Sequence, residues 1–163
     1  MVVTDPQKRS QVAALYKQSW DVYNSQRARP TPAQIANPEQ MGRVSGSAQF
    51  LADHLAEVPL FIIPCIEGRA EQAPSWVQAG LYGSILPATW SLMLALRSRG
   101  LGSAWTTLHL RYEQEAATVL GIPETVTQVA LLPVAYYTGD DFKPALRESA
   151  RKVTYWDSWG ATK

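Results

Sequence analysis

Few side chains in this sequence are of the types that carry out acid–base, nucleophilic or metal chemistry. The chain of 163 residues has one cysteine, Cys65, and two histidines, His54 and His109. A zinc site needs three or four His, Cys or carboxylate ligands at suitable spacing, so this supply predicts no metal centre. The sequence also lacks a GxxxxGKS/T loop and a GxSxG turn, the usual signatures of phosphoryl transfer and of α/β-hydrolase chemistry.

Structural roles explain the two histidines, and the glycines at 100 and 102, better than chemical roles do. His54 follows Asp53, but adjacent helical positions point in different directions, so a core or boundary position is favoured over an acid–base pair. His109 follows a predicted strand, where ligand contacts often lie, and structure is still favoured over catalysis. Gly100-Leu101-Gly102 resembles a dinucleotide fingerprint, but Trp105 stands where its third glycine belongs. A binding module, or an enzyme whose chemistry belongs to a bound cofactor, remains.

Charge and composition exclude several classes of partner. Fifteen Lys and Arg against fourteen Asp and Glu give a formal charge of +1, so no long-range field attracts nucleic acid or anionic lipid. Cys65 has no cysteine to pair with, and the first residues do not form a secretory signal, which together predict a cytoplasmic protein. The longest nearly apolar stretch, Ile85 to Leu96, is too short to span a bilayer and predicts a core helix instead of a membrane anchor.

The first third of the chain predicts two helices that lead to a buried strand. Met1 to Val3 predicts a strand, and Asp5 and Pro6 predict the cap and first position of a helix that runs to about Ser25. Prolines between residues 29 and 38 break regular structure, and residues 42–47 predict a loop. A helix capped near Ser47 then carries four side chains on one side, namely Phe50, Leu51, His54 and Leu55. Residues 60–66 form a continuous apolar run, typical of a strand buried on both faces.

The remainder predicts a long apolar helix followed by short strands and an aromatic tail. Residues 76–96 indicate one helix, or two with a bend near residues 80–87, and its second half is apolar on nearly every face, as expected at the centre of a molecule. Glycines end this helix, and residues 104–108 predict a strand. A helix over residues 112–120 follows and is closed by Gly121-Ile122-Pro123. Residues 127–133 predict another strand. Residues 153–159 are too aromatic for a solvated tail, so we expect them to dock on another surface.

Several segments resemble one known family. Residues 84–107, SILPATWSLMLALRSRGLGSAWTT, resemble the central helix and following strand of nitroreductase-family flavoproteins. Leu120-Gly121-Ile122-Pro123 and residues 129–136 resemble the family's next helix end and strand. Arg147 and the following Val153-Thr154-Tyr155-Trp156 resemble its C-terminal basic residue and tail. The resemblance covers the chain from Val2 to Trp159.

The resemblance implies a fold, an assembly and an activity. The fold is α+β, a mixed central sheet wrapped by helices in one domain over residues 1–163. The assembly is an intertwined homodimer, with the C-terminal extension docked on the partner subunit and two FMN sites at the interface. The activity is hydride transfer from NAD(P)H to FMN and on to nitroaromatic, quinone or similar acceptors. Because the flavin performs the redox step, no side chain is expected to be catalytic.

The same resemblance assigns the cofactor-binding residues. Pro87 and Ala88 are expected to pack against the flavin ring, and backbone groups around Thr106, Thr107 and Leu108 to approach its redox-active edge. Arg147 is expected to pair with the FMN phosphate, a role that suits a guanidinium group. Lys143 is a weaker second candidate for that pairing.

One departure from the family leaves an alternative function open. Family members carry an N-terminal helix with an arginine-rich motif and a loop ending in a proline-tryptophan pair, both of which hold FMN. This sequence begins about where the strand after that loop would be under way, which predicts a truncated gene product or a start site placed too far downstream. Losing those arginines would weaken FMN binding. The alternative is a non-catalytic flavin-binding or dimeric interaction protein.

Overall fold

The chain folds around a small sheet with helices on both faces. The structure is a computed structural model that describes residues 1–26, 38–139 and 147–162. The sheet has the order β1-β2-β6-β4 and consists of β1 (Val2–Val3), β2 (Leu60–Ile62), β6 (Leu132–Tyr136) and β4 (Leu101–Ser103). A second sheet pairs β3 (Cys65–Glu67) with β5 (Val126–Gln128). The predicted α+β class is confirmed.

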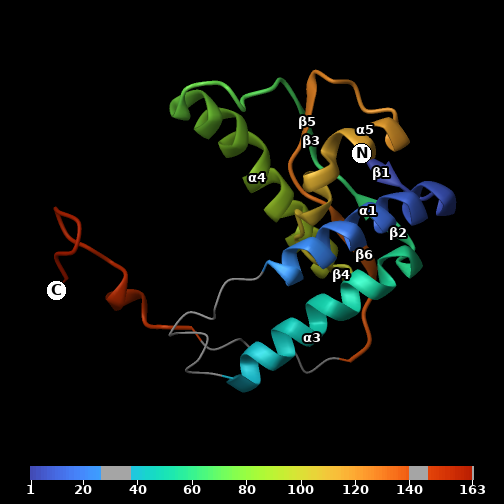
Figure 1. The fold of residues 1–163 in the computed structure, drawn as a ribbon. Coiled ribbons are helices and arrows are strands. Elements are labelled where there is room, and N and C mark those ends of the chain that lie inside the picture. The colour runs from blue at the N-terminus through green and yellow to red at the C-terminus, as the bar shows by residue number, and fades with distance from the viewer. Residues whose placement is uncertain (27–37, 140–146, 163) are drawn as a thin grey trace.

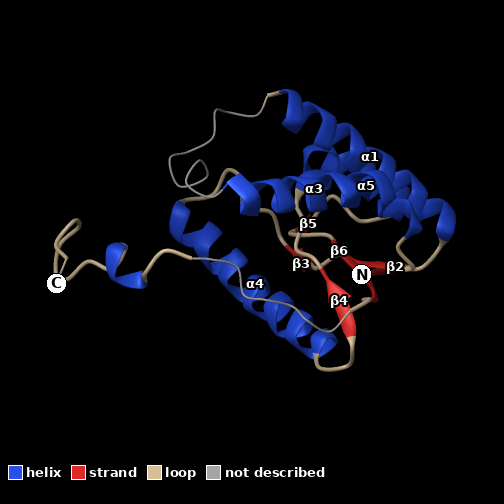
Figure 2. Ribbon diagram, turned by 90° about the horizontal axis from the view of Figure 1, so that it is seen from below, coloured by secondary structure: helices blue, strands red, loops and turns tan. Residues whose placement is uncertain are grey.

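Helices cover the two faces of the central sheet unequally. On one face lie α1 (Pro6–Ser25), α3 (Pro38–His54) and α5 (Glu113–Leu120), and on the other, among the described residues, lies α4 (Ser75–Arg97) (Figures 1 and 2). Phe61 points into the first layer and is fully buried, whereas its neighbours Leu60 and Ile62 contact the α4 side. This alternation is the period of a strand with two covered faces.

The strands pair in antiparallel register. Val2 lies opposite Ile62, and Leu101 lies opposite Tyr136. All pairings between the named strands are antiparallel. The expected mixture of strand directions is therefore limited, among the described residues, to an isolated parallel bridge between Gly68 and Val126.

The start of α1 follows the sequence signal. The Asp5 side chain accepts a hydrogen bond from the Lys8 amide at 2.8 Å, and Pro6 occupies the first helical position. Both features satisfy or remove amide groups that have no partner within the helix. The predicted helix, including its end at Ser25, is confirmed.

Removing this cap gives the first stability prediction. We expect Asp5→Ala to lower the free energy of unfolding by about 1 kcal/mol, because one amide at the start of α1 loses its acceptor. Urea denaturation followed by circular dichroism measures the change. Thr4→Ala is the matched control at the preceding exposed position, and an equal loss in both variants would contradict the role of the cap.

The prediction of a loop over residues 42–47 is wrong. Helix α3 begins at Pro38 and includes Gly42 and Gly46, so it starts well before Ser47. Each glycine costs about 1 kcal/mol relative to alanine in a helix, a preference that the surrounding helical run outweighs. The inner face of α3 consists of Ala48, Leu51, Ala52 and the following Leu55, while Phe50 is 64% exposed, so the expected grouping with Phe50 is also wrong.

Two predicted strands are divided in the structure, and a third is misplaced. The run over residues 60–66 is divided at Ile63 and Pro64, and the run over residues 127–133 is divided between β5 and β6. The predicted strand over residues 104–108 is wrong: β4 comes earlier, at Leu101–Ser103, and Thr106 makes only an isolated bridge with Leu131. Proline cannot donate to a strand ladder, which explains the division at Pro64.

Helix α4 is continuous, but its predicted central place is wrong for a single chain. Of its residues only Thr89 is buried, and Trp90 and Leu94 are 58% and 56% exposed. Its inner side packs on the sheet through Leu92, Met93 and Leu96. An outer stripe at helical spacing faces away and contains Trp76, Gly80, Gly83, Pro87, Trp90 and Leu94. A helix that is apolar on every side needs a cover that one chain does not supply.

The expectation that this helix is too short to span a bilayer also needs correction. By length and composition alone, the whole of α4 could cross a membrane. Core helices of similar length and composition meet the same criterion, so the surroundings of α4 decide its role. Those surroundings are a sheet that lies along one side of the helix.

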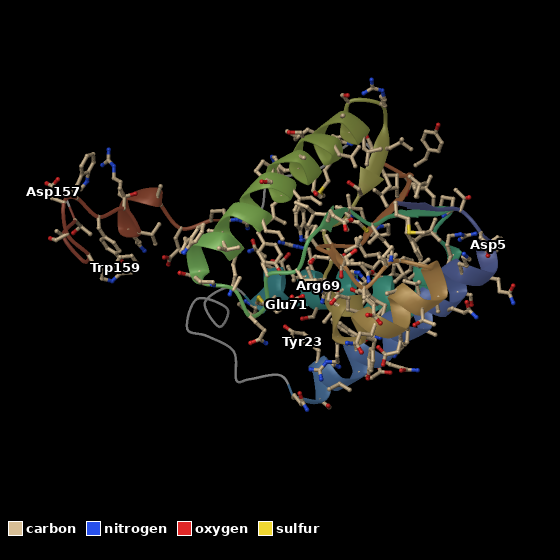
Figure 3. All side chains as sticks on the ribbon, turned by 90° about the horizontal axis from the view of Figure 1, so that it is seen from above. Asp5, Tyr23, Arg69, Glu71, Asp157 and Trp159 are labelled. Carbon is tan, nitrogen blue, oxygen red and sulfur yellow. The ribbon has the colours of Figure 1, made fainter. Side chains whose placement is uncertain are left out.

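The C-terminal part of the chain combines a confirmed helix stop with an extended arm. Gly121 ends α5 with a φ of 70°, and the Ile122 amide donates to the Ala117 carbonyl at 2.9 Å, as the sequence predicted. Residues 147–162, the C-terminal arm, extend away from the sheet and helices (Figure 1). The end of the arm carries Asp157 and Trp159 (Figure 3), and Trp159 is 93% exposed.

Candidate functional site

The candidate residues are positioned by a hairpin of helix and strand. After α4 the chain turns at Gly100, whose φ is 76°, and β4 returns along the helix (Figure 2). From Arg97 back to Pro87 the helix rises about 15 Å, at about 1.5 Å per residue. From Leu101 to Thr106 an extended chain covers about 16 Å, at about 3.3 Å per residue. By chain length alone, the return segment is long enough to bring Thr106 to about the level of Pro87.

Pro87 and Ala88 lie on the exposed side of α4. Proline inside a helix removes one hydrogen bond and crowds the carbonyl four residues earlier, which here belongs to Gly83. A side chain on Gly83 would meet nothing within 4 Å, so the helix is open on this side. Thr89, one residue on, is buried and donates its hydroxyl to the Ile85 carbonyl at 2.9 Å. The result is a small apolar surface, open to a flat ligand.

In the return segment, Thr106 is held from two sides. Its amide donates to the Leu131 carbonyl at 3.2 Å, and its carbonyl accepts from the Leu131 amide at 2.8 Å. Its hydroxyl donates to the Tyr16 hydroxyl at 3.1 Å in a buried contact. These bonds occupy the Thr106 amide, so any backbone donor for a ligand at this point must come from its neighbours.

Thr107 and Leu108 supply the accessible groups of this segment. Thr107 is exposed, and its carbonyl accepts from the Leu110 amide at 3.0 Å at the start of a 3-10 helix. Within the described residues its amide and hydroxyl have no hydrogen bond. The Leu108 side chain packs against the core of the α1 face, which fixes the backbone there. The amide and hydroxyl of the exposed Thr107 therefore come directly after Thr106, whose position is fixed by hydrogen bonds.

Of the two residues expected to bind the FMN phosphate, Arg147 and Lys143, neither is seen beside Pro87, Ala88 and Thr107 within the described part of one chain. Arg147 lies at the start of the C-terminal arm and is exposed. The arm leads away from the body of the chain in each view (Figures 1 and 2). Lys143 lies outside the described residues.

An apolar groove of about 370 Å³ continues the exposed side of α4 toward the turn. It is lined by Trp90, Met93, Leu94, Arg97, Leu101, Gly102, Ser103 and Tyr137. The Arg97 guanidinium lies 4.4 Å from the centre of the Tyr137 ring, a cation–π arrangement. The sequence predicted the apolar character of this helix but placed it in the core, so the groove was not expected.

A larger cavity of about 640 Å³ lies beside α5 and is polar. Arg69 donates to both carboxylate oxygens of Glu113, at 2.8 and 3.0 Å, and also pairs with Glu71 at 2.5 Å (Figure 3). Burial raises the pKa of Glu113, but hydrogen bonds from Arg69 and the Gln128 amide outweigh it and lower the pKa overall. These charges are already paired with one another, so the cluster ties α5 to β5 and presents no reactive group.

The two histidines differ in their surroundings. The His109 side chain is fully buried, and burial lowers its pKa to about 4, while the nearby Glu113 opposes that shift. Neither ring nitrogen has a hydrogen-bond partner among the described residues. His54 lies at the surface, 2.8 Å from Glu57, and stacks on Phe50. In the part of the chain that the structure describes, no three His, Cys, Asp or Glu side chains form a possible metal site.

The remaining candidate of the sequence, Cys65, is half-buried in β3. Its thiol donates to the Ile63 carbonyl at 3.3 Å, and burial raises its pKa. A thiol with a raised pKa is a poor nucleophile at neutral pH. Cys65 therefore behaves as a small apolar residue, as expected from its sequence neighbours.

Comparison with known proteins identifies the relatives of this fold. The family model described as the nitroreductase family matches residues 1–136. A search of curated protein sequences finds no match.

Among solved structures, an iodotyrosine deiodinase bound to FMN and 3-iodo-L-tyrosine has 20% identity and a TM-score of 0.63, over 91% of this chain and 70% of that one. An FMN- and NADPH-dependent nitroreductase from Sphigopyxis sp. strain HMH has 17% identity and a TM-score of 0.59, over 98% of this chain and 79% of that one. A BluB-like flavoprotein from Clostridium difficile 630 has 13% identity and a TM-score of 0.60, over 97% of this chain and 78% of that one. These similarities support the fold.

Proposed function

Because the chain belongs to the nitroreductase family, we propose that it is a flavin-dependent oxidoreductase that binds FMN. In this proposal NAD(P)H is the electron donor, and nitroaromatic, quinone or similar compounds are the acceptors. When bound, FMN supplies the redox chemistry, and the polypeptide binds and orients it. Similar structures include an FMN- and NADPH-dependent nitroreductase and a deiodinase that binds FMN, which supports the cofactor more strongly than any one substrate.

The observation that carries the proposal is the exposure of two surfaces, one on α4 and one on the segment that follows β4. Pro87 and Ala88 present an exposed apolar surface, and Thr107 presents an amide and a hydroxyl that are not otherwise bonded among the described residues. A flavin ring has flat apolar faces and a polar edge, so this donor set fits its chemistry. Leu108 completes the segment by anchoring it to the core.

For the phosphate we propose Arg147, delivered by the C-terminal arm. The arm leads away from the rest of its own chain (Figure 1). Its aromatic residues Tyr155, Trp156 and Trp159 are suited to dock on a second subunit. A guanidinium binds phosphate oxygens with two parallel hydrogen bonds. The proposed site would then be shared between two chains.

Replacing this arginine tests the phosphate contact. We expect Arg147→Ala to weaken FMN binding by about tenfold at low salt and by clearly less at high salt, because exposed charge contacts are screened. Fluorescence titration of FMN at two salt concentrations measures both affinities. Arg151→Ala, on the same arm, is the matched control. Unchanged affinity in Arg147→Ala would place the phosphate contact elsewhere.

The partner that we propose is a second copy of the chain. The outer stripe of α4 is apolar and contains two glycines, Gly80 and Gly83, where an added Cβ would meet nothing within 4 Å. Small residues between large apolar ones let two helices approach closely. A lipid bilayer is a poorer cover for this helix, because β4 is the edge strand of the sheet beside it and open strand edges are not satisfied in lipid. We therefore propose a cytoplasmic homodimer of single-domain chains, residues 1–163, that binds neither membrane nor nucleic acid.

Reconstitution tests the function directly. The purified chain should turn yellow with FMN, and the bound flavin should bleach when NADH or NADPH is added without oxygen and recover its colour with a quinone or nitroaromatic. A chain that binds FMN but is not reduced by either nucleotide would support the alternative of a non-catalytic flavin-binding protein. A chain that remains colourless at every FMN concentration would reject both.

A further inference from the structure

We infer that Tyr16 is a positioning residue that sets the place of Thr106 and Thr107 and, through them, of the polar edge of the flavin. The inference rests on the proposed function, in which Thr107 meets that edge. Tyr16 lies 90 residues before Thr106 in the sequence, on a different element, and neither composition nor motif connects the two. The hydrogen bond between their hydroxyls, at 3.1 Å, is the observation that carries the inference.

The contact with Tyr16 adds to the two backbone bonds that hold Thr106 in the return segment. The strand β4 ends at Ser103, and the residues on either side of Thr106, Trp105 and Thr107, are exposed. The two backbone bonds with Leu131 hold Thr106 in the plane of the sheet. The hydrogen bond to Tyr16 restrains the Thr106 side chain in a second direction, toward the α1 layer.

The direction of the hydrogen bond between Thr106 and Tyr16 affects the orientation of Thr107. In extended chain successive side chains point to opposite sides. The Thr106 side chain is drawn inward to Tyr16, whereas the following residue, Thr107, is exposed. If Thr106 turned, the exposed amide and hydroxyl of Thr107 would turn with it.

Tyr16 is itself fixed well enough to serve as an anchor. It is 3% exposed and lies on the inner side of α1, between Val12 and Trp20, which are also buried. Trp20 donates to the Gln49 side chain at 2.9 Å and so ties this part of α1 to α3. Burial raises the pKa of Tyr16, opposed by the hydrogen bond from Thr106, so the hydroxyl stays neutral near pH 7 and the contact persists there.

The test combines two substitutions that remove one hydroxyl each. Tyr16→Phe and Thr106→Val keep the size and shape of the side chains, and the double variant completes a cycle. Ser19→Ala is the control, because Ser19 is fully buried on the same helix and its hydroxyl has no partner among the described residues. Two readouts are needed: amide hydrogen exchange at Thr106 and Leu131 without flavin, and anaerobic flavin reduction by NAD(P)H together with the FMN dissociation constant.

Both readouts have definite expected values. Exchange at the two amides should rise about tenfold in Tyr16→Phe, in Thr106→Val and equally in the double variant, which matches the loss of one buried hydrogen bond. Flavin reduction should slow by about tenfold while the FMN dissociation constant changes by less than about threefold, because the polar edge shifts while the ring contacts remain. Ser19→Ala should match the unmodified chain in both.

The two readouts separate failure of the inference from failure of the function. Unchanged exchange in Tyr16→Phe overturns the inference whether or not flavin binds. Faster exchange with an unchanged reduction rate overturns it as well, since the hold would then be structural only. If the unmodified chain does not bind FMN, the proposed function fails, and the part of the inference that concerns the flavin fails with it.

Discussion

Replacing Leu94 with glutamate is expected to convert the dimer into monomers. Leu94 is 56% exposed in the single chain and lies on the outer stripe of α4, one turn after Trp90. In the proposed dimer both side chains are buried against the second copy. An unpaired carboxylate there loses its hydration without gaining a partner, which raises the dimer dissociation constant by about a hundredfold or more. Sedimentation velocity over a range of protein concentrations measures that constant.

The consequence for the cofactor follows from the shared site. If Arg147 reaches the phosphate from the partner's arm, Leu94→Glu should also reduce FMN affinity, although Leu94 is not proposed to touch the flavin. Phe50→Glu is the matched control, because Phe50 is a similarly exposed apolar side chain on α3, away from the outer stripe. Dissociation by Phe50→Glu, or a dimer that tolerates Leu94→Glu, would place the interface elsewhere.

Lowering the pH from 7 to 4 is expected to destabilise the fold by about 3 kcal/mol through His109 alone. The pKa of His109 is about 4 in the folded chain, mainly because of burial, against 6.5 as the ordinary value. Between these values the unfolded chain binds a proton that the folded chain does not. Stability is therefore full above pH 6.5 and falls as the pH approaches 4. Urea denaturation at fixed protein concentration and at several pH values measures this slope.

The contribution of His109 can be separated from that of the nearby carboxylate. The pKa of Glu113 is lowered below its ordinary value of 4.5, so its stabilising effect is lost only below that pH. The window between pH 6.5 and 4.5 then reports on His109. His109→Gln, which has no titrating ring, should flatten the slope in that window. An unchanged slope in this variant would show that another group is responsible.

The elements that were predicted well are those whose signals are local. Asp5 and Pro6 start α1 through backbone chemistry within one turn, and Gly121 ends α5 because it adopts a positive φ. Such signals depend on few neighbours and survive in the folded chain. The strands were harder, since an apolar run does not show where it is paired. The pairing of β3 with β5 and the early position of β4 depend on partners far along the sequence.

The error about α4 has a different origin. Apolar residues on every side of a helix predict burial correctly but do not say which chain supplies the cover. The candidate site shows the same division. Pro87, Ala88 and Thr107 could be proposed from a resemblance over residues 84–107, and in the structure all three are exposed. The contact between Tyr16 and Thr106 could not, because nothing in either segment indicates a hydrogen-bonded pair.

The most direct test of the account is a crystal structure of the chain with FMN bound. We expect two chains packed through the outer stripe of α4, with the flavin ring between Pro87–Ala88 and Thr107 and its phosphate near an arginine of the C-terminal arm. A flavin found instead in the polar cavity beside Arg69 and Glu113, or a dimer that leaves Trp90 and Leu94 exposed to solvent, would contradict it.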